Sequence, residues 1–438
     1  MTSMRWQAIA ALLLWGLAPA WGQSAGVLDA VHGLSADDLV AGALARNGDL
    51  LAARQQVAAA RGGLTQAGLR ANPSVDVSGM REIGGSDNNF MLGGSLPLEL
   101  FGRRARRVDV ARGDLLMSQY EAAQRERQLR LDIELKLGEV LAALRNLQFT
   151  EELAGLNEKA VELMRARVEK GSAAPLELNL LRVELSRTQA TRADLEGKLG
   201  VLLLELKSLA GMRPEAALPL KGTLEPSALA LTLEAATERA LRRRPDLLEV
   251  RASETVTAAK VRQARVEGRP DASVNANYQR MDFGFGVNGI APGGGLRRVQ
   301  GIFHEVTVGV AVALPVRNRN QGAIESAVAQ QEAALRRREY AELIVKREVA
   351  AAFLSYQKAR ESLDIYRGGV REQARQNLDV VRQVYELGRT PYTDVIAEQR
   401  RYVDAETGYT DALQRYYQAS VRLCSAVAGD GREPCREP

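Results

Sequence analysis

The sequence predicts a mainly α-helical protein that carries a small β-sheet built for a membrane. Three observations support this fold class: very long stretches of helix-forming residues, four short segments in which apolar and polar residues alternate, and an internal two-fold repeat. With 438 residues, 46% of them hydrophobic and 26% charged, the chain fits neither a disordered protein nor a small disulfide scaffold. The expected architecture is a tube of coiled-coil helices joined to membrane strands.

Two helical stretches are too long for a compact domain. No proline occurs between residues 103 and 170 or between 323 and 387, so each stretch can extend ~100 Å as a helix. Two shorter helices, expected at 35–71 and 175–210, together match the first long one in length and could stack beside it. Apolar residues recur at the spacing of a coiled-coil seam, which predicts core packing. They are Leu137, Leu141, Leu144, Leu153, Leu156, Ala160 and Leu163 in the first stretch, and Val349, Phe353, Tyr356, Ala359, Leu363, Tyr366, Val370, Ala374, Leu378, Val381 and Tyr385 in the second.

The chain consists of two tandem copies of one unit. The pattern AL-x-R-x-x-DLL-x-x-R at 43–54 recurs at 240–251, and GSAAPLEL at 171–178 aligns with GRTPYTDV at 388–395. The second copy contains an insertion of about twenty residues, whose Gly-rich sequence at 281–301 predicts a long flexible surface loop. The predicted division is a signal peptide at 1–22, a first repeat at 23–226, a second repeat at 227–428 and a C-terminal tail at 429–438.

Four segments alternate between apolar and polar residues as β-strands do. The alternation is clearest at 305–314 and 272–279 and weaker at 73–80 and 90–98. Each segment has about ten residues, the length of a tilted membrane strand, although a half-buried soluble sheet would alternate equally. Four strands are too few to close a barrel, because small membrane barrels begin at about eight. Open edges are costly in lipid, so we expect several chains to share one barrel.

The first 22 residues have the pattern of a Sec signal peptide. Arg5 precedes an apolar run at 8–18, and small residues follow at Ala20 and Gly22. The apolar run is too short to span a membrane as an anchor, and the absence of a nearby cysteine argues against N-terminal lipidation. Export predicts an oxidising compartment, where Cys424 and Cys435 would form a local disulfide; two free thiols are the alternative.

The sequence contains no pattern that predicts catalysis. Neither HExxH, CxxC, GxSxG nor a Walker motif occurs, and the only two histidines, His32 and His304, belong to different predicted elements. A G-x-G-x-x-G match at 284–289 lies between alternating segments, where no helix follows to bind a pyrophosphate. The net charge of +5 is small and dispersed, which argues against a nucleic-acid partner. We therefore expect no enzyme activity, no cofactor and no resident metal.

Several local motifs together identify a family. They are the repeated Asp-Leu-Leu pattern, Ala71-Asn72-Pro73 and Gly268-Arg269-Pro270 before strands, LPLELFGRR from Leu96, and LPVRNRNQGAIESA from Leu314. With them the chain resembles the TolC-type outer-membrane efflux proteins, in particular their heavy-metal (CzcC-like) branch, over essentially the whole mature sequence.

The resemblance implies a homotrimer in a Gram-negative outer membrane, surrounded by lipid, with a shared twelve-stranded β-barrel and a periplasmic α-barrel that ends in a closable tip. It further implies a passive exit duct that receives substrate from a periplasmic adaptor and an inner-membrane RND-type pump. The branch suggests cobalt, zinc or cadmium ions as cargo. Efflux of drugs or organic solutes is the alternative within the family, and a periplasmic coiled-coil scaffold is the alternative from another class.

The resemblance also assigns residues at the tip, which family members hold shut by polar contacts and line with acidic rings. Asp394 matches one acidic position, and Glu177 is its counterpart in the first repeat. Tyr385 matches a tyrosine that bonds across to the neighbouring coiled coil. Because both carboxylates follow a proline, capping of a helix N-terminus is an alternative role for each.

Two family positions differ in this chain. The basic latch residue is replaced by Thr390, with Arg389 beside it, and the second acidic ring position is Ala397, with Glu398 beside it. A ring of three Asp394 carboxylates at a constriction would by itself attract cations. The predicted adaptor-docking surface surrounds the two helix turns, which are marked by Gly171, Pro175, Gly388 and Pro391.

Overall fold

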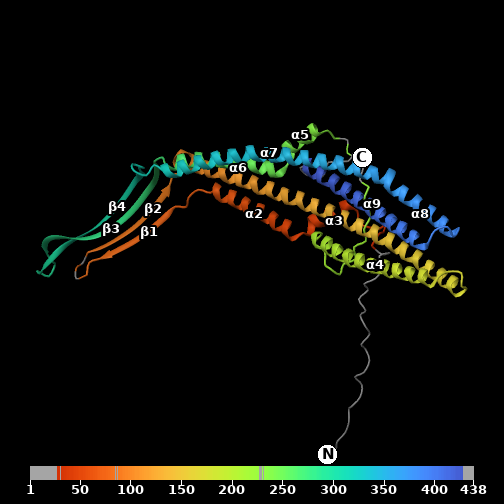
Figure 1. Ribbon diagram of the computed structural model, residues 1–438. Coiled ribbons are helices and arrows are strands. Elements are labelled where there is room, and N and C mark those ends of the chain that lie inside the picture. The colour runs from red at the N-terminus through yellow and green to blue at the C-terminus, as the bar shows by residue number, and fades with distance from the viewer. Residues whose placement is uncertain are drawn as a thin grey trace, which may run out of the picture.

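Figure 1 shows a computed structural model of the chain, an elongated molecule with four strands at one end of a long helical bundle. The structure describes residues 27–29, 31–83, 85, 87–225, 229 and 231–427. The predicted signal peptide and Cys435 lie outside the described residues, so the predicted disulfide to Cys424 stays a prediction.

The first repeat is built around one very long helix. Its helices are α1 (Ala36–Arg46), α2 (Gly48–Gly68), α3 (Arg103–Glu169) and α4 (Pro175–Leu209), with the short turn η2 (Leu100–Gly102) before α3. Both α2 and α4 pack along α3, α2 near its start and α4 near its end, as Figure 1 shows. Ion pairs mark the two regions: Asp49 of α2 contacts Arg125, and Arg192 of α4 contacts Glu151. The predicted stacking of shorter helices beside a long one is confirmed, but the single helix expected at 35–71 is divided into α1 and α2 at Asn47, whose backbone is extended.

The second repeat has the same order, and its long helix contains one π-helical turn. Its helices are α5 (Leu233–Arg243), α6 (Pro245–Glu267), α7 (Gln321–Ile365), the π-helical turn η3 (Tyr366–Val370), α8 (Arg371–Glu386) and α9 (Tyr392–Val427). The predicted long helix is therefore confirmed, because α7, η3 and α8 follow one another without a gap, but its winding widens locally at η3. Gly368 and Gly369 lie within η3, and glycine is the weakest helix former after proline, which explains why the regular α-helix yields there.

The main core lies in the middle of the bundle, where the two repeats pack together. Leu137 and Leu144 of α3, Val349 of α7 and Leu413 of α9 are buried in it. The predicted seam fails farther along α3, because Leu156 and Leu163 are 56% and 64% exposed. The residues buried there lie on a neighbouring stripe of the helix: Ala154, Asn157, Val161 and Met164. A straight helix drifts against a seven-residue repeat, so the contact stripe moves around its surface.

The sheet has the strand order β1-β2-β3-β4, with all neighbours antiparallel. Its strands are β1 (Ser74–Arg81), β2 (Asn88–Pro97), β3 (Asp271–Ile290) and β4 (Leu296–Ala313). The register places Val77 opposite Leu92, Leu92 opposite Tyr278, and Tyr278 opposite Val306, so these side chains share one face. Toward the helices the other residues on that face are also apolar or glycine: Val75, Gly79, Phe90, Gly94, Leu96, Ala272, Val274, Ala276, Val308, Val310 and Val312. Toward the far end the same face carries polar residues: Arg81, Asn88, Arg280, Asp282 and His304.

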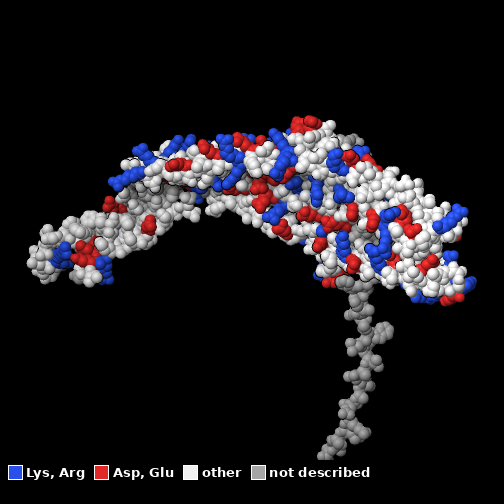
Figure 2. Space-filling view, viewed as in Figure 1, with Lys and Arg blue, Asp and Glu red and all other residues white. Residues whose placement is uncertain are grey.

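The opposite face of the sheet is polar. It carries Asp76 and Ser78 of β1, Asn277 and Gln279 of β3, and Thr307 of β4. Figure 2 shows that charged side chains cover the helices and the far end of the strands, with few between these regions. Among the described helices, none combines the length and apolar character needed to span a membrane.

The β3–β4 hairpin is longer than predicted. The strands have 20 and 18 residues, and most of segment 281–301 continues their pairing, with the connection limited to residues 291–295. The expectation of a long flexible loop was therefore wrong. Backbone pairing with one neighbour is enough to order this Gly-rich sequence, and its aromatic and β-branched residues favour strands. A register shift between Gly284 and Asn288 accommodates part of the insertion.

Candidate functional site at the helical tip

The end of the bundle farthest from the strands contains one helix turn from each repeat (Figure 1). Gly171 after α3 and Gly388 after α8 both have a φ of +69°, which favours glycine. The residue after each glycine donates its N–H to the carbonyl five residues back, the hydrogen bond of a Schellman turn. Pro175 then begins α4, and Pro391 directly precedes α9. The four predicted docking-turn residues therefore build two copies of the same turn.

An apolar cluster joins the two turns. We call α3–α4 the first coiled coil and α8–α9 the second coiled coil. The ring of Tyr385 packs edge-on against the ring of Tyr392, with 5.1 Å between centroids. The other buried members are Val161 and Met164 of α3, Leu178 and Leu181 of α4, and Val395 and Ile396 of α9. Hydrophobic contact thus holds the second coiled coil against the first.

The structure brings Tyr385 and Glu177 together. The Tyr385 hydroxyl donates a hydrogen bond to Glu177 Oε2 at 3.2 Å, which links α8 to the first turn of α4. The pKa of Tyr385 is raised mainly by burial and, to a smaller extent, by the negative charge of the Glu177 carboxylate. Burial also raises the pKa of Tyr392 to about 12. Both phenols therefore keep their protons at neutral pH, and Tyr385 remains a donor.

Asp394 and Arg389 lie at the same turn but on its solvent side. The Asp394 carboxylate accepts a short hydrogen bond from the Thr390 hydroxyl, and the residue lies in the first turn of α9, where the helix dipole favours a negative charge. Arg389 is exposed beside it. Both of the roles considered for Asp394, helix start and exposed acidic position, are compatible with this geometry.

The neighbouring position considered for a second acid behaves differently. Ala397 is exposed, whereas Glu398 is buried and forms an ion pair with Arg401 at 2.8 Å. Glu398 therefore faces the interior of the second coiled coil. Among the described residues, no group of three or more His, Cys, Asp or Glu side chains could hold a metal ion.

A buried polar chain that the sequence reasoning missed crosses the bundle near the tip. Gln399 of α9 donates to Asn157 of α3 at 3.0 Å, and Asn157 donates to Thr188 of α4 at 3.2 Å. Beside it, Arg400 pairs with Glu184 at 2.7 Å. No signal in the sequence predicted it, because position 157 lies outside the predicted seam of Leu153, Leu156, Ala160 and Leu163. Such satisfied networks fix the register of packed helices.

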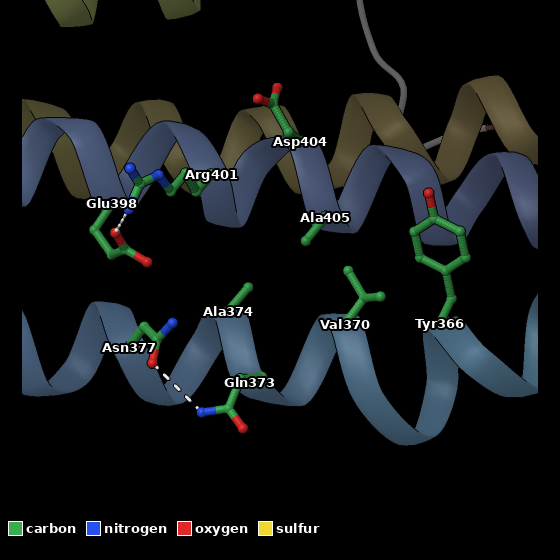
Figure 3. A pocket seen from close by; sticks show the side chains of 9 residues that line it. All are labelled: Tyr366, Val370, Gln373, Ala374, Asn377, Glu398, Arg401, Asp404 and Ala405. Carbon is green, nitrogen blue, oxygen red and sulfur yellow. Dashed lines mark hydrogen bonds and ion pairs between the residues drawn. The ribbon is translucent and has the colours of Figure 1, made fainter.

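An open groove separates α8 from α9 above the tip. Its volume is about 490 Å³, and Figure 3 shows side chains from both helices pointing toward it. Val370, Ala374 and Ala405 supply apolar surface, and the Glu398–Arg401 ion pair lies at one end. The remaining lining residues are Tyr366, Gln373, Asn377 and Asp404. The two helices of the second coiled coil are therefore less tightly joined here than at the turn.

Comparison with known proteins agrees with this architecture. The Cobalt-zinc-cadmium resistance protein CzcC of Cupriavidus metallidurans is 23% identical over 379 residues, which cover 86% of each chain. Among solved structures, CusC superimposes with a TM-score of 0.74 at 19% identity, covering 90% of this chain and 92% of its own. The outer membrane protein VceC of Vibrio cholerae gives 0.72 at 18% identity, with 90% and 96% covered.

A third structure, the open state of the MtrE outer membrane channel of Neisseria gonorrhoeae, gives a TM-score of 0.70 at 17% identity and covers 90% of this chain and 89% of its own. The family profile described as Outer membrane efflux protein matches residues 39–212 and 236–429, one stretch in each repeat. The chain belongs to the outer membrane efflux protein family.

Proposed function

We propose that the chain is the outer-membrane exit duct of a tripartite efflux system and works as a homotrimer. The observation that carries this proposal is the sheet: from Ala272 to Tyr278 one face is apolar and the other is largely polar, and β1 and β4 are edge strands. Three copies would supply twelve strands, enough to close a barrel with lipid outside and water inside. The family assignment removes the periplasmic scaffold as an alternative.

The helical tip would be the controlled end of the duct. The Tyr385–Glu177 hydrogen bond and the apolar cluster support a latch between the two coiled coils, and Asp394 would contribute to a cation-attracting ring at the aperture. Arg389, exposed at the same turn, would take the place of the family's basic latch residue. The paired turns at Gly171–Pro175 and Gly388–Pro391 would receive the periplasmic adaptor, which connects the duct to an RND-type pump in the inner membrane.

The proposed cargo is divalent heavy-metal cations such as cobalt, zinc or cadmium. Its support is the similarity to CzcC, whose name describes cobalt-zinc-cadmium resistance. A duct conducts without storing its cargo, so its own sequence constrains cargo weakly. Efflux of drugs or organic solutes remains the second candidate. The chain would reach the outer membrane through its predicted signal peptide, 1–22, without N-terminal lipidation.

A deletion strain of the source organism tests the cargo. We expect hypersensitivity to zinc, cobalt or cadmium that the intact gene restores and that a copy lacking residues 271–313, the β3–β4 hairpin, does not restore. Copper, dyes and antibiotics are the comparison panel. Hypersensitivity to dyes or antibiotics alone would contradict metal cargo and favour the second candidate, whereas normal growth on every compound would contradict the duct itself.

A further inference from the structure

The polar face of the sheet changes character near the free end of the β3–β4 hairpin. Along this face the paired residues are Asn277 with Thr307, then Gln279 with Glu305, and then Met281 with Phe303. Phe283 follows on the same face, opposite Gly301. A surface that suits water therefore becomes aromatic within two residue pairs.

The aromatic side chains form a compact cluster. The ring centroids of Phe283 and Phe285 are 5.9 Å apart, as are those of Phe285 and Phe303, and both pairs are edge-to-face. A Cβ at Gly301 would lie 2.9 Å from the Phe303 ring and 3.3 Å from the Phe285 ring, so the rings cover this glycine closely. Even so, the three phenylalanines are 53%, 39% and 46% exposed in the single chain. The three rings therefore contact one another, but none of the described residues covers their outer surface.

The position of the cluster along the duct follows from the shorter hairpin. The Asp87 carboxylate, in the β1–β2 connection, accepts a hydrogen bond from the Gly284 N–H at 2.9 Å. Beyond this level β3 and β4 continue without β1 and β2 beside them, as Figure 1 shows. The cluster therefore lies where the four-stranded part of the sheet ends, at the mouth farthest from the helices.

A role as a lipid-facing aromatic girdle does not fit the register. Girdle residues lie on the outer, apolar face of a membrane barrel. Phe283 and Phe303 lie on the opposite face, which they share with Asn277 and Thr307, and at their level the outer face carries Asp282 paired with Ile302. The aromatic surface consequently points toward the interior of the duct.

We propose that the Phe283–Phe285–Phe303 clusters of three copies form a hydrophobic collar at the outer mouth of the duct. The inference rests on the proposed trimer, because the partner copies contribute the side chains that cover each cluster and complete the collar. A hydrophobic constriction resists wetting and can close a pore to bulky polar solutes without a charged gate. The collar would limit entry from outside, independently of the helical tip at the other end.

Access to a lumenal cysteine from outside the cell tests the collar. The reporter is Asn277→Cys, on the polar face below the collar, in a full-length chain that also carries Cys424→Ser and Cys435→Ser. The probe is a maleimide on a polyethylene glycol chain too large for general porins, applied to intact cells. We expect slow labelling with the natural collar and labelling faster by about tenfold with Phe283→Ser and Phe303→Ser, which corresponds to about 1.4 kcal/mol of barrier.

Two further variants make the result specific. Ile302→Ser lies on the outer face at the same level and should leave the labelling rate unchanged, whereas Phe285→Ser should accelerate it. Chemical cross-linking of outer membranes checks the trimer in every variant. An intact trimer whose labelling is equally fast, or equally absent, with and without the phenylalanines would overturn the collar alone. Failure of the natural chain to form a trimer would overturn both the proposed function and the collar.

Discussion

The two coiled coils end in the same turn but differ in the helix that leads to it. Gly171 and Gly388 share a φ of +69° and the same pair of backbone hydrogen bonds. Behind Gly171, α3 runs through 67 residues without interruption. Behind Gly388, the helix contains the π-helical turn η3, where the Arg371 N–H bonds the Tyr366 carbonyl five residues back. The two repeats therefore share the same turn but differ in the winding of the helix that precedes it.

Polar contacts hold the π-helical turn of the second repeat in place on both sides. Arg371 pairs with the buried carboxylate of Glu406 at 2.6 Å and lies 5.0 Å from the Tyr409 ring centroid. Arg367 pairs with Glu225 at 3.2 Å. The groove between α8 and α9 begins at this turn, because Tyr366 lines it. Because the π-helical turn and the open groove both lie in the second coiled coil, we expect α8 to move more readily than the end of α3.

The largest expected effect follows from releasing α8 at its end. Tyr385→Phe removes the hydrogen bond that joins α8 to α4, and Asp394→Ala removes the local bond from Thr390 within the second turn. A hydrogen bond contributes about 0.5–1.5 kcal/mol, and three copies would act together in the proposed trimer, so we expect the open population to rise by about tenfold or more. Single-channel conductance in planar bilayers measures it.

The matched control is the first turn. The Ser172 hydroxyl, in the turn after α3, donates to the carbonyl of Arg167 in the last turn of α3, and Ser172→Ala should leave conductance unchanged. If both changes raised the conductance equally, either coiled coil could move, and the proposed difference between them would be wrong. No increase from the double variant would refute the gating role of Tyr385 and Asp394.

A second effect compares two glycines that each face an aromatic ring. A Cβ at Gly138 of α3 would lie 2.6 Å from the Tyr417 ring in the main core, and a Cβ at Gly408 of α9 would lie 2.7 Å from the Tyr366 ring. Tyr417 is buried, whereas Tyr366 borders the open groove and can turn aside. We expect Gly138→Ala to cost about 2–3 kcal/mol and Gly408→Ala about 1 kcal/mol or less. Thermal unfolding of the purified channel ranks them, and the reverse order would contradict the lower mobility expected of the first coiled coil.

The pH dependence of the tip provides a third test. The folded pKa of Tyr392, about 12, exceeds the usual tyrosine value near 10. A raised pKa means that folding favours the protonated phenol, so this stabilisation is fully present below about pH 10 and is lost as the pH rises through about 12. Burial also raises the pKa of Tyr416 to about 12, so we expect the ultraviolet tyrosinate titration to contain late steps from both residues near pH 12, of which Tyr392→Phe removes one. A titration identical in both proteins would contradict the burial of this ring.

The sequence predicted the fold class, the repeat, both turns and the four strands because each has a local signal. Alternation marked the strands, and Gly-then-Pro spacing marked the turns at Gly171 and Gly388. It failed where neighbours decide the outcome. Leu156 and Leu163 follow the predicted seam but are exposed, and the insertion after Met281 is ordered by pairing between strands. The Gly368-Gly369 pair is the sequence feature that could have predicted the π-helical turn in the second long helix.

The site was predictable only through resemblance. Tyr385 and Glu177 are separated by about two hundred residues, and their contact depends on how the coiled coils pack. The buried chain from Gln399 through Asn157 to Thr188 likewise requires three helices in register. Single-sequence patterns describe one helix face at a time, so contacts between faces stay hidden until the helices are assembled.

The smallest expected effect comes from changing the π-helical turn η3 alone. A Cβ at Gly155 of α3 or at Gly369 of η3 would meet open space. Alanine is a better helix former than glycine by about 0.5–1 kcal/mol, so either change should raise the unfolding temperature slightly. Only Gly369→Ala should also lower the open population in planar bilayers, because it stiffens the segment that lets α8 move. If Gly155→Ala lowers it equally, bending is not confined to η3, and the difference between the two coiled coils lies in the contacts of the tip alone.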